Sequence, residues 1–346
     1  MPERVLVTGA TGFVGSAVTR AFVRAGYRVR VLARTESKRD NLTGIDVESV
    51  RGDLCEPDSL RAALAGCDGL VHTAADYRLF VPDPAPLYAV NVGGTRALME
   101  AALASGCRRV VHCSSVAVLG HRAKGAPADE TTGAPLAEMV GPYKRSKHLA
   151  EAAMADLLGR GLPAVIVNPT APVGPRDARP TPTGRMVLEA ARGRMPAYLD
   201  TGLNIVHVDD VGEGHLLAYQ RGRVGERYIL GGDNLTLAEI FADIARLAGQ
   251  RAPRLRLPAA PLVPLAWFAE GWARLTRTSP RLTRDELAMA RHPMYFTSAK
   301  AERELGYVHR PAQQAFADAL AWFAARGMLR RPERARRPLS RTQSER

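Results

Sequence analysis

The sequence predicts an α/β fold, in which a doubly wound parallel sheet carries a small C-terminal α/β lobe. Three observations support this fold. Strand-like and helix-like runs alternate through the first two-thirds of the 346 residues, and the first strand runs straight into a glycine-rich turn. After Asn168 and Pro169 the alternation gives way to a stretch rich in proline, glycine and threonine. Hydrophobic residues make up 46% of the chain, which is sufficient for a large core.

The glycine-rich turn comes first in the chain. A strand predicted over Val5–Thr8 is followed by three spaced glycines and by a helix predicted over Gly12–Ala25. Gly9 allows a sharp turn, Gly12 lets the backbone approach a phosphate, and Gly15 lets the helix lie close to the strand. Glycines at this spacing also occur in plain turns. A second strand directly after the helix favours a Rossmann-type dinucleotide site instead.

The rest of the predicted sheet follows in order. Its further strands are Tyr27–Ala33, Val47–Arg51, Gly69–Thr73, Arg109–Ser114 and Ala164–Asn168. Its further helices are Asp58–Leu64, Pro86–Ser105 and Pro142–Gly159. Such alternation is typical of a parallel sheet covered by helices on both faces.

The C-terminal part begins with a predicted functional loop over residues 170–183. Beyond the loop we expect strands Asn204–His207 and Glu226–Leu230, and helices Gly184–Arg192, Asp209–Arg221, 236–249, 260–275 and 283–290. A nucleotide-binding domain is predicted over residues 1–170 with part of 200–232, and a substrate-binding lobe mainly over 171–328. The helix near 262–275 is apolar and contains Trp267 and Trp272. It packs within the lobe or, alternatively, forms a wall for an apolar substrate.

Composition limits the class of protein. The net charge is +13, and residues 330–346 hold seven arginines against two glutamates, so this predicted disordered tail supplies five of the excess charges. The other arginines form no basic stripe, which argues against nucleic-acid binding and leaves a peripheral membrane contact open. The four cysteines lack metal-type spacing and indicate reduced thiols in the cytoplasm. We expect no signal peptide, no membrane-spanning segment and, from the spacing of the histidines, no metal.

The candidate catalytic residues lie near the middle of the chain. Tyr143 and Lys147 are four residues apart on a predicted helix, so both side chains share one face. A nearby ammonium should lower the pKa of the phenol and make it an acid or base for a carbonyl oxygen. Such a pair is common on helix surfaces by chance. Ser114 and Ser115 end a strand at the same predicted sheet edge, which favours catalysis.

At this point the chain resembles the extended short-chain dehydrogenases/reductases. The resemblance covers roughly residues 3–310. It rests, in order, on the glycine turn, Gly52-Asp53-Leu54, Asn91-Val92-Gly93-Gly94-Thr95, Ser114-Ser115, Tyr143 with Lys147, Asn168-Pro169 and His207-Val208-Asp209-Asp210-Val211. Within them the chain looks most like the NAD-dependent epimerase/dehydratase and dihydroflavonol reductase branch. Residues 168–177, 181–185 and 193–198 look like the hopanoid-associated sugar epimerases of bacteria.

The resemblance implies a role for each matched position. Tyr143 is the expected acid/base, Lys147 lowers its pKa and holds the nicotinamide ribose, and Ser115 orients the substrate oxygen. Asp209 and Asp210 are expected to brace the lobe junction. The expected cofactor-binding residues also include Tyr143 and Lys147; the others are Thr8, Gly9, Thr11, Gly12, Phe13, Val14, Gly15, Arg34, Asp53, Leu54, Ala74, Ala75 and Pro169.

One departure concerns the substrate. Many sugar epimerases have a tyrosine four residues after the catalytic serine, where this chain has Leu119. Arg176, Arg185 and Arg194, in and after the predicted loop, are candidates for binding an anionic substrate group, or solvated loop residues.

The second strand bears on the choice of cofactor. A carboxylate at its end would hold the adenosine ribose and favour NAD, but here the strand ends in Arg34, with Lys38 and Arg39 close behind. A guanidinium can pair with a 2′-phosphate, so NADP is the expected cofactor, with NAD as the alternative. A solvent-facing arginine is the other interpretation.

The sequence thus predicts an NAD(P)-dependent enzyme that moves a hydride between nicotinamide and a carbinol or carbonyl carbon of a small molecule. The first hypothesis is a sugar epimerase linked to hopanoid metabolism, and the second is an NADPH-dependent carbonyl reductase of the dihydroflavonol reductase type. The expected substrate is a sugar or a polyol or lipid-linked carbonyl. A non-catalytic dinucleotide sensor is disfavoured because Tyr143 and Lys147 are both retained. A homodimer through the helices over 86–105 and 142–159 is implied by the resemblance.

Overall fold

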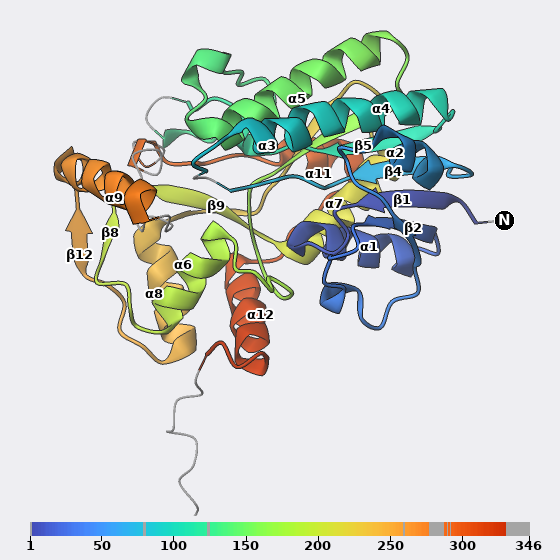
Figure 1. Cartoon of the computed structure of the whole chain (residues 1–346). Coiled ribbons are helices and arrows are strands. Elements are labelled where there is room, and N and C mark those ends of the chain that lie inside the picture. Colours follow the sequence, from blue (N-terminus) through green and yellow to red (C-terminus); the bar gives the residue numbers. More distant parts are fainter. Residues whose placement is uncertain are drawn as a thin grey trace, which may run out of the picture.

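A computed structural model describes residues 2–78, 81–122, 125–258, 260–276, 287–288, 290 and 292–329. Its centre is a seven-stranded parallel sheet in the order β10-β6-β5-β4-β1-β2-β3 (Figure 1). The strands are β1 (Arg4–Thr8), β2 (Arg28–Ala33), β3 (Glu48–Arg51), β4 (Gly69–His72), β5 (Arg109–Cys113), β6 (Ala164–Pro169) and β10 (Arg227–Leu230). The predicted Rossmann-type α/β fold is confirmed.

Helices cover both faces of this sheet. On one face, α1 (Phe13–Arg24) and α7 (Val208–Arg221) pack over Val5, Val71 and other odd-numbered strand residues. On the other face, α2 (Pro57–Leu64), α4 (Thr95–Ala104) and α5 (Gly141–Gly159) pack over even-numbered residues such as Leu6 and Leu70. Side chains of a strand alternate between faces, so each buried strand must be apolar at nearly every position.

The remaining elements form a smaller region. A three-stranded sheet has the order β11 (Asp233–Thr236), β9 (Gly202–His207) and β7 (Ala171–Val173), and β12 (Leu255–Leu257) pairs with β8 (Ala197–Leu199). Helices α6 (Pro182–Ala191), α8 (Leu237–Ala248) and α12 (Ala312–Ala325) contribute to one apolar cluster around Phe241 and Phe316. Helix α9 (Val263–Thr276) also belongs to this region, whereas α11 (Ala299–Leu305) packs on α7 and β10 of the sheet domain. None of the described helices is both long and apolar enough to cross a membrane.

Several sequence predictions need correction. The helix expected over 86–105 is divided into α3 (Ala85–Tyr88), a π-helical segment (Ala89–Gly94) and α4. Here the Asn91 amide bonds to Asp76 and Ser146, and a methyl group on Gly94 would press on Leu54. The loop expected over 170–183 contains strand β7 and ends in the start of α6.

Other elements were not predicted. These are β8, β11, β12, α11 and α12. The α12 helix had a usable signal, because its buried residues Ala312, Ala315, Phe316 and Ala319 recur at helical spacing. Most of the helix expected over 283–290, and the tail beyond residue 329, lie outside the described residues.

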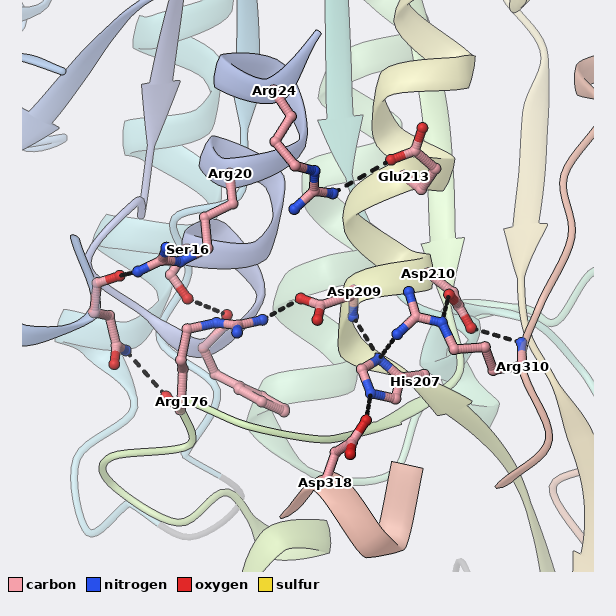
Figure 2. Close-up of polar contacts among 12 residues, drawn as sticks. Ser16, Arg20, Arg24, Arg176, His207, Asp209, Asp210, Glu213, Arg310 and Asp318 are labelled. Atoms are coloured by element: carbon pink, nitrogen blue, oxygen red, sulfur yellow. Dashed lines mark hydrogen bonds and ion pairs between the residues drawn. The ribbon is translucent and has the colours of Figure 1, made fainter. Parts of the chain in front are cut away.

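Ion pairs hold the smaller region against the sheet domain (Figure 2). Arg176, in the segment after β7, pairs with Asp209 in the first turn of α7. Asp210 forms an ion pair with the Arg310 guanidinium, whose Nε lies 2.9 Å away, and accepts a hydrogen bond from the Arg310 backbone amide at 2.7 Å. His207 Nε2 lies 3.2 Å from a carboxylate oxygen of Asp318 on α12. Asp209 and Asp210 therefore brace the junction between the two regions, as the resemblance implied.

Three histidines are buried within the sheet domain. His72 Nδ1 lies 2.7 Å from the Thr8 hydroxyl and its Nε2 lies 2.9 Å from the Thr95 hydroxyl. His112 stacks on His72, and neither of its ring nitrogens has a hydrogen-bond partner among the described residues. Burial lowers the pKa of His72 to about 3 and that of His215 to about 4, and it lowers the pKa of His112 well below 6.5.

These histidines predict acid sensitivity. The unfolded chain takes up their protons near pH 6.5, whereas the folded protein does so only at much lower pH, so stability is lost as the pH falls. Below about pH 6, each of these histidines should lower the free energy of unfolding by about 1.4 kcal/mol per pH unit. His112→Phe keeps an aromatic ring and loses no hydrogen bond. Between about pH 6 and pH 4.5, the free energy of unfolding measured with urea should therefore fall less steeply with pH, by about that amount. His148→Phe on α5 is the control, and equal slopes for wild type and His112→Phe would contradict the prediction.

Candidate active site

A cavity of about 1130 Å³ follows the carboxyl edge of the seven-stranded sheet. Its wall is made by the turn after β1, the residues that follow β2, β3 and β4, the ends of β5 and β6, the start of α5 and the segment leading into α6. Every residue expected to be catalytic or to bind the cofactor lines this cavity: Thr8, Gly9, Thr11, Gly12, Phe13, Val14, Gly15, Arg34, Asp53, Leu54, Ala74, Ala75, Ser115, Tyr143, Lys147 and Pro169. Residues that lie up to 161 positions apart in the sequence thus face one space.

The glycine turn forms one wall of the cavity. Gly9 has φ +71°, and a methyl group there would lie 2.6 Å from the Ala74 nitrogen. A methyl group on Gly15 would overlap the Gly9 carbonyl oxygen. Gly12 caps α1 without a side-chain hydrogen bond, and the first turn of α1 has no acidic residue. The free amides and the positive end of the helix dipole therefore face the cavity, which fits the pyrophosphate of a dinucleotide.

The cavity wall opposite the glycine turn is formed by residues that follow β2 and β3 in the chain. Arg34 and Ser37 line it, and a hydrogen bond of 3.1 Å from the Ser37 amide to the Arg34 carbonyl keeps the two residues in one turn. Asp53 also lines this end, and one of its carboxylate oxygens accepts a hydrogen bond from the Cys55 amide at 2.9 Å. Sequence reasoning named Arg34 and Asp53 but missed Ser37, whose signal was its place three residues after Arg34.

The catalytic candidates lie at the other end of the cavity. Tyr143 and Lys147 come from the first two turns of α5, and Ser115 follows β5. Lys147 is almost fully buried, and its ammonium donates a hydrogen bond to the Cys113 carbonyl at 2.8 Å. The Ser115 side chain accepts a hydrogen bond from the Ala117 amide at 3.1 Å and lies close enough to the Tyr143 phenol to act on its pKa. The serine and the tyrosine thus line the same part of the cavity.

The electrostatics of Tyr143 differ from the sequence prediction. Burial raises the pKa of Tyr143 to about 12, and the nearby Ser115 hydroxyl only partly opposes this rise. The expected lowering by Lys147 is absent from the described structure because the ammonium is engaged at Cys113 and burial lowers its own pKa. The phenol therefore holds its proton at neutral pH and can donate it.

A polar network fixes the start of α5 and the end of β5. The Asn91 side-chain amide donates to the Ser146 hydroxyl at 2.9 Å and to the Asp76 carbonyl at 2.8 Å. The Asn168 amide donates to the Ser115 carbonyl at 2.9 Å and to Glu151 at 3.1 Å. Asn91 and Asn168 belong to motifs that the sequence analysis quoted, but it gave them no role. These bonds hold Ser115 and Tyr143 in register without lying in the cavity themselves.

The end of the cavity beyond Tyr143 is basic. Tyr77, Arg78, Arg179 and Arg185 line it, and Arg78 pairs with Asp76. Burial raises the pKa of Tyr77, while Arg179 and Arg185 act to lower it, so both guanidinium groups lie near the phenol.

The other residues considered for substrate binding lie elsewhere. Of the arginines named from the sequence, Arg185 lines the cavity, whereas Arg176 and Arg194 pair with Asp209 and Glu189. Leu119 is buried in a separate apolar cluster. The four cysteines are free, and the described part of the chain holds no group of residues suited to a metal ion.

Comparison with known proteins places this site in context. The model of the NAD dependent epimerase/dehydratase family matches residues 5–231. A dihydroflavonol 4-reductase-like protein of Synechocystis sp. is 41% identical, over 95% of this chain and 97% of the relative. Sterol demethylase protein B of Methylococcus capsulatus is 38% identical, over 94% of this chain and 99% of that protein. The crystal structure of gox2253 shares 50% identity and a TM-score of 0.86, over 95% of this chain and all of that one.

The glycine turn gives a direct test of the dinucleotide seat. A methyl group on Gly12 would meet only the Gly9 carbonyl oxygen, at 3.2 Å, so Gly12→Ala should cost less than about 1 kcal/mol of stability. The same methyl group would occupy space that a phosphate needs, so the Kd for NADPH should rise by at least about tenfold. Gly15→Ala is the contrasting variant, because it should lower the melting temperature as well. Calorimetry and thermal unfolding check both variants, and unchanged affinity in Gly12→Ala would contradict the assignment.

Proposed function

Because the chain belongs to the NAD-dependent epimerase/dehydratase family of enzymes, we propose that it is an NADPH-dependent carbonyl reductase. The observation that carries this proposal is the protonated phenol of Tyr143, which lines the dinucleotide cavity together with Ser115. Reduction of a carbonyl needs a proton donor beside the oxygen, and a phenol with a pKa of about 12 is in the donor form at neutral pH.

The adenosine end of the cavity supports NADPH as the reductant. Arg34 and Ser37 line the wall after β2, where a carboxylate would otherwise hold the ribose hydroxyls. A guanidinium and a hydroxyl are donors suited to a 2′-phosphate. The reduced nicotinamide, when bound, supplies a hydride to the carbonyl carbon of the substrate.

The chain's own residues supply the rest of the reaction. Ser115 donates a hydrogen bond to the substrate oxygen, and the Tyr143 hydroxyl gives that oxygen a proton as the carbonyl becomes an alcohol. Lys147 lies beside this proton donor, fixed on the Cys113 carbonyl, where its ammonium can hold the nicotinamide ribose and stabilise the phenolate that remains. Water then returns a proton to the phenolate.

The substrate class follows from the similar proteins and the cavity. The relatives at 41% and 38% identity carry names that refer to a flavonoid reductase and to sterol demethylation, which concern ring systems with large apolar surfaces. Val90, Pro169 and Pro172 give the cavity apolar wall area near Tyr143. We therefore propose a ketone on an apolar or lipid-linked ring as the substrate.

A second candidate is the sugar epimerase linked to hopanoid metabolism. The observation in its favour is the pair of guanidinium groups, Arg179 and Arg185, at the substrate end, which suit the phosphates of a nucleotide sugar. In that case the keto intermediate is reduced on its other face and the cofactor is regenerated. Net oxidation of NADPH, one per product, supports the reductase, whereas interconversion of sugar epimers without net oxidation supports the epimerase.

The homodimer and the cytoplasmic location stay predictions. The four free cysteines accord with a reducing compartment. Sedimentation of the purified protein tests the dimer.

Removing the proton donor tests the proposed reaction. In Tyr143→Phe the turnover number for a dihydroflavonol or a 3-ketosteroid should fall by about 10²- to 10⁴-fold, because no group replaces the phenol as acid. The Kd for NADPH should rise far less than the turnover number falls, and Tyr198→Phe, outside the cavity, is the matched control. A Tyr143→Phe enzyme that oxidises NADPH at the wild-type rate would refute the assignment.

Cofactor choice is tested at the adenosine end. Arg34→Leu should raise the Kd for NADPH by about 10- to 100-fold, since a charge-assisted hydrogen bond to a phosphate contributes about 1.5–3 kcal/mol. Affinity for NADH should change little, because NADH has no 2′-phosphate. Arg39→Leu, five residues further and away from the cavity wall, is the control. Equal losses for the two cofactors would mean that Arg34 does not recognise the phosphate.

A further inference from the structure

Helix α9 presents an apolar face to solvent. Leu265, Trp267, Phe268 and Trp272 are between 55% and 70% exposed, although they are among the largest apolar side chains of the protein. Phe268 and Trp272 stack on each other, with ring centroids 6.5 Å apart. Figure 1 shows α9 at one end of the molecule, next to β12 and far from β1 and β2. Contiguous exposed apolar side chains of this kind mark an interaction site.

The direction of this face is fixed by the opposite side of the helix. Ala266, Glu270 and Ala273 are buried, and their spacing of four and three residues defines one inner stripe. The outward positions between them are Pro264, Leu265, Trp267, Phe268, Gly271 and Trp272, so this part of the outer face carries no charge. The helix is therefore amphipathic in an unusual sense, with its single acidic residue inside and its aromatic rings outside.

The four exposed side chains Leu265, Trp267, Phe268 and Trp272 define the α9 patch, and basic residues precede this helix in the chain. Arg251, Arg254 and Arg256 are exposed in and just before β12, at the same end of the molecule as α9 (Figure 1). Only one of these three, Arg256, has an ion-pair partner among the described residues, namely Asp200. The end of the molecule that carries the patch thus also carries positive charge.

We propose that the α9 patch docks on the surface of an anionic lipid bilayer. Tryptophan and phenylalanine side chains enter the boundary between headgroups and acyl chains, and arginines beside them attract anionic headgroups. The net charge of +13, of which residues 330–346 supply five, adds attraction to such a surface. A second copy of the chain would bring the same arginines face to face, which disfavours self-association through this patch.

This docking deepens the proposed function, on which its biological purpose rests. A ketone on an apolar ring system dissolves in a bilayer rather than in water, so an enzyme held at the bilayer surface meets its substrate at high local concentration. The docking itself depends only on the α9 patch and the basic residues, and it can be measured without substrate or cofactor.

Flotation with vesicles tests the docking. The full-length protein should float with an equal mixture of phosphatidylcholine and phosphatidylglycerol and much less with phosphatidylcholine alone, and added salt should reduce its binding. Phe268→Ser combined with Trp272→Ser should lower the partition coefficient by at least about tenfold, because two large apolar side chains no longer enter the bilayer. Val224→Ser combined with Val308→Ser is the matched control, since it removes two exposed apolar side chains from other parts of the surface.

Tryptophan fluorescence gives an independent measurement. Two of the three tryptophans lie on α9, so lipids brominated on their acyl chains should quench the wild-type emission on binding. Deletion of residues 330–346 should weaken binding without abolishing the quenching. Melting temperature and NADPH affinity should match wild type in all variants, which separates loss of docking from loss of the fold.

Three outcomes would overturn the proposal. The wild-type protein fails to float with anionic vesicles; the Phe268 and Trp272 variant floats as well as the control; or that variant changes the oligomeric state, which would assign the patch to a second copy. A Tyr143→Phe enzyme that keeps the wild-type rate would refute the proposed function without affecting flotation, so failure of the docking and failure of the proposed function remain distinguishable.

Discussion

The close contact between the glycine turn and the end of β4 determines where everything else in the site lies. Gly9 places its backbone so near Ala74 that no side chain fits, and the Thr73 hydroxyl donates to the Thr8 carbonyl at 2.6 Å. The Thr8 hydroxyl also forms a hydrogen bond with His72 on β4. Because the turn is held from two sides, α1 begins at the carboxyl edge of the sheet with its free amides aimed into the cavity.

The same edge brings the catalytic candidates into reach of a bound nicotinamide. Parallel strands end at the same edge of the sheet. Ser115 after β5 and Pro169 on β6 therefore lie near each other because of the strand register, although no local sequence pattern indicates it. Burial, and not the neighbouring ammonium, sets the charge state of Tyr143 in this structure.

The sequence was most informative where one local pattern determines one backbone geometry. The glycine turn, the apolar strands and the Tyr143–Lys147 spacing each predicted a feature that the structure contains. It was least informative where distant segments compete. The short strand β8 pairs with β12, which lies almost 60 residues later in the chain. The ammonium of Lys147 donates a hydrogen bond to the Cys113 carbonyl at the edge of the sheet. Neither of these partners can be predicted from local spacing. Likewise, the three exposed aromatic side chains on α9 resemble core residues in the sequence until the buried stripe of that helix is known.

The segment after β7 connects the two ends of the cavity. Arg176 is the one described non-glycine residue with a left-handed backbone, at φ +75°, a conformation that persists only when its surroundings hold it. The side chain of Arg176 pairs with Asp209. The Asn41 side-chain amide donates hydrogen bonds to the Arg176 carbonyl at 3.0 Å and to the Thr11 carbonyl at 3.2 Å. Asn41 follows the turn that carries Arg34, and Arg176 precedes the arginines at the substrate end. Arg176, with its strained backbone, therefore links the segment at the adenosine end of the cavity to the segment at the substrate end. A large shift of either segment would break the hydrogen bond between Asn41 and Arg176.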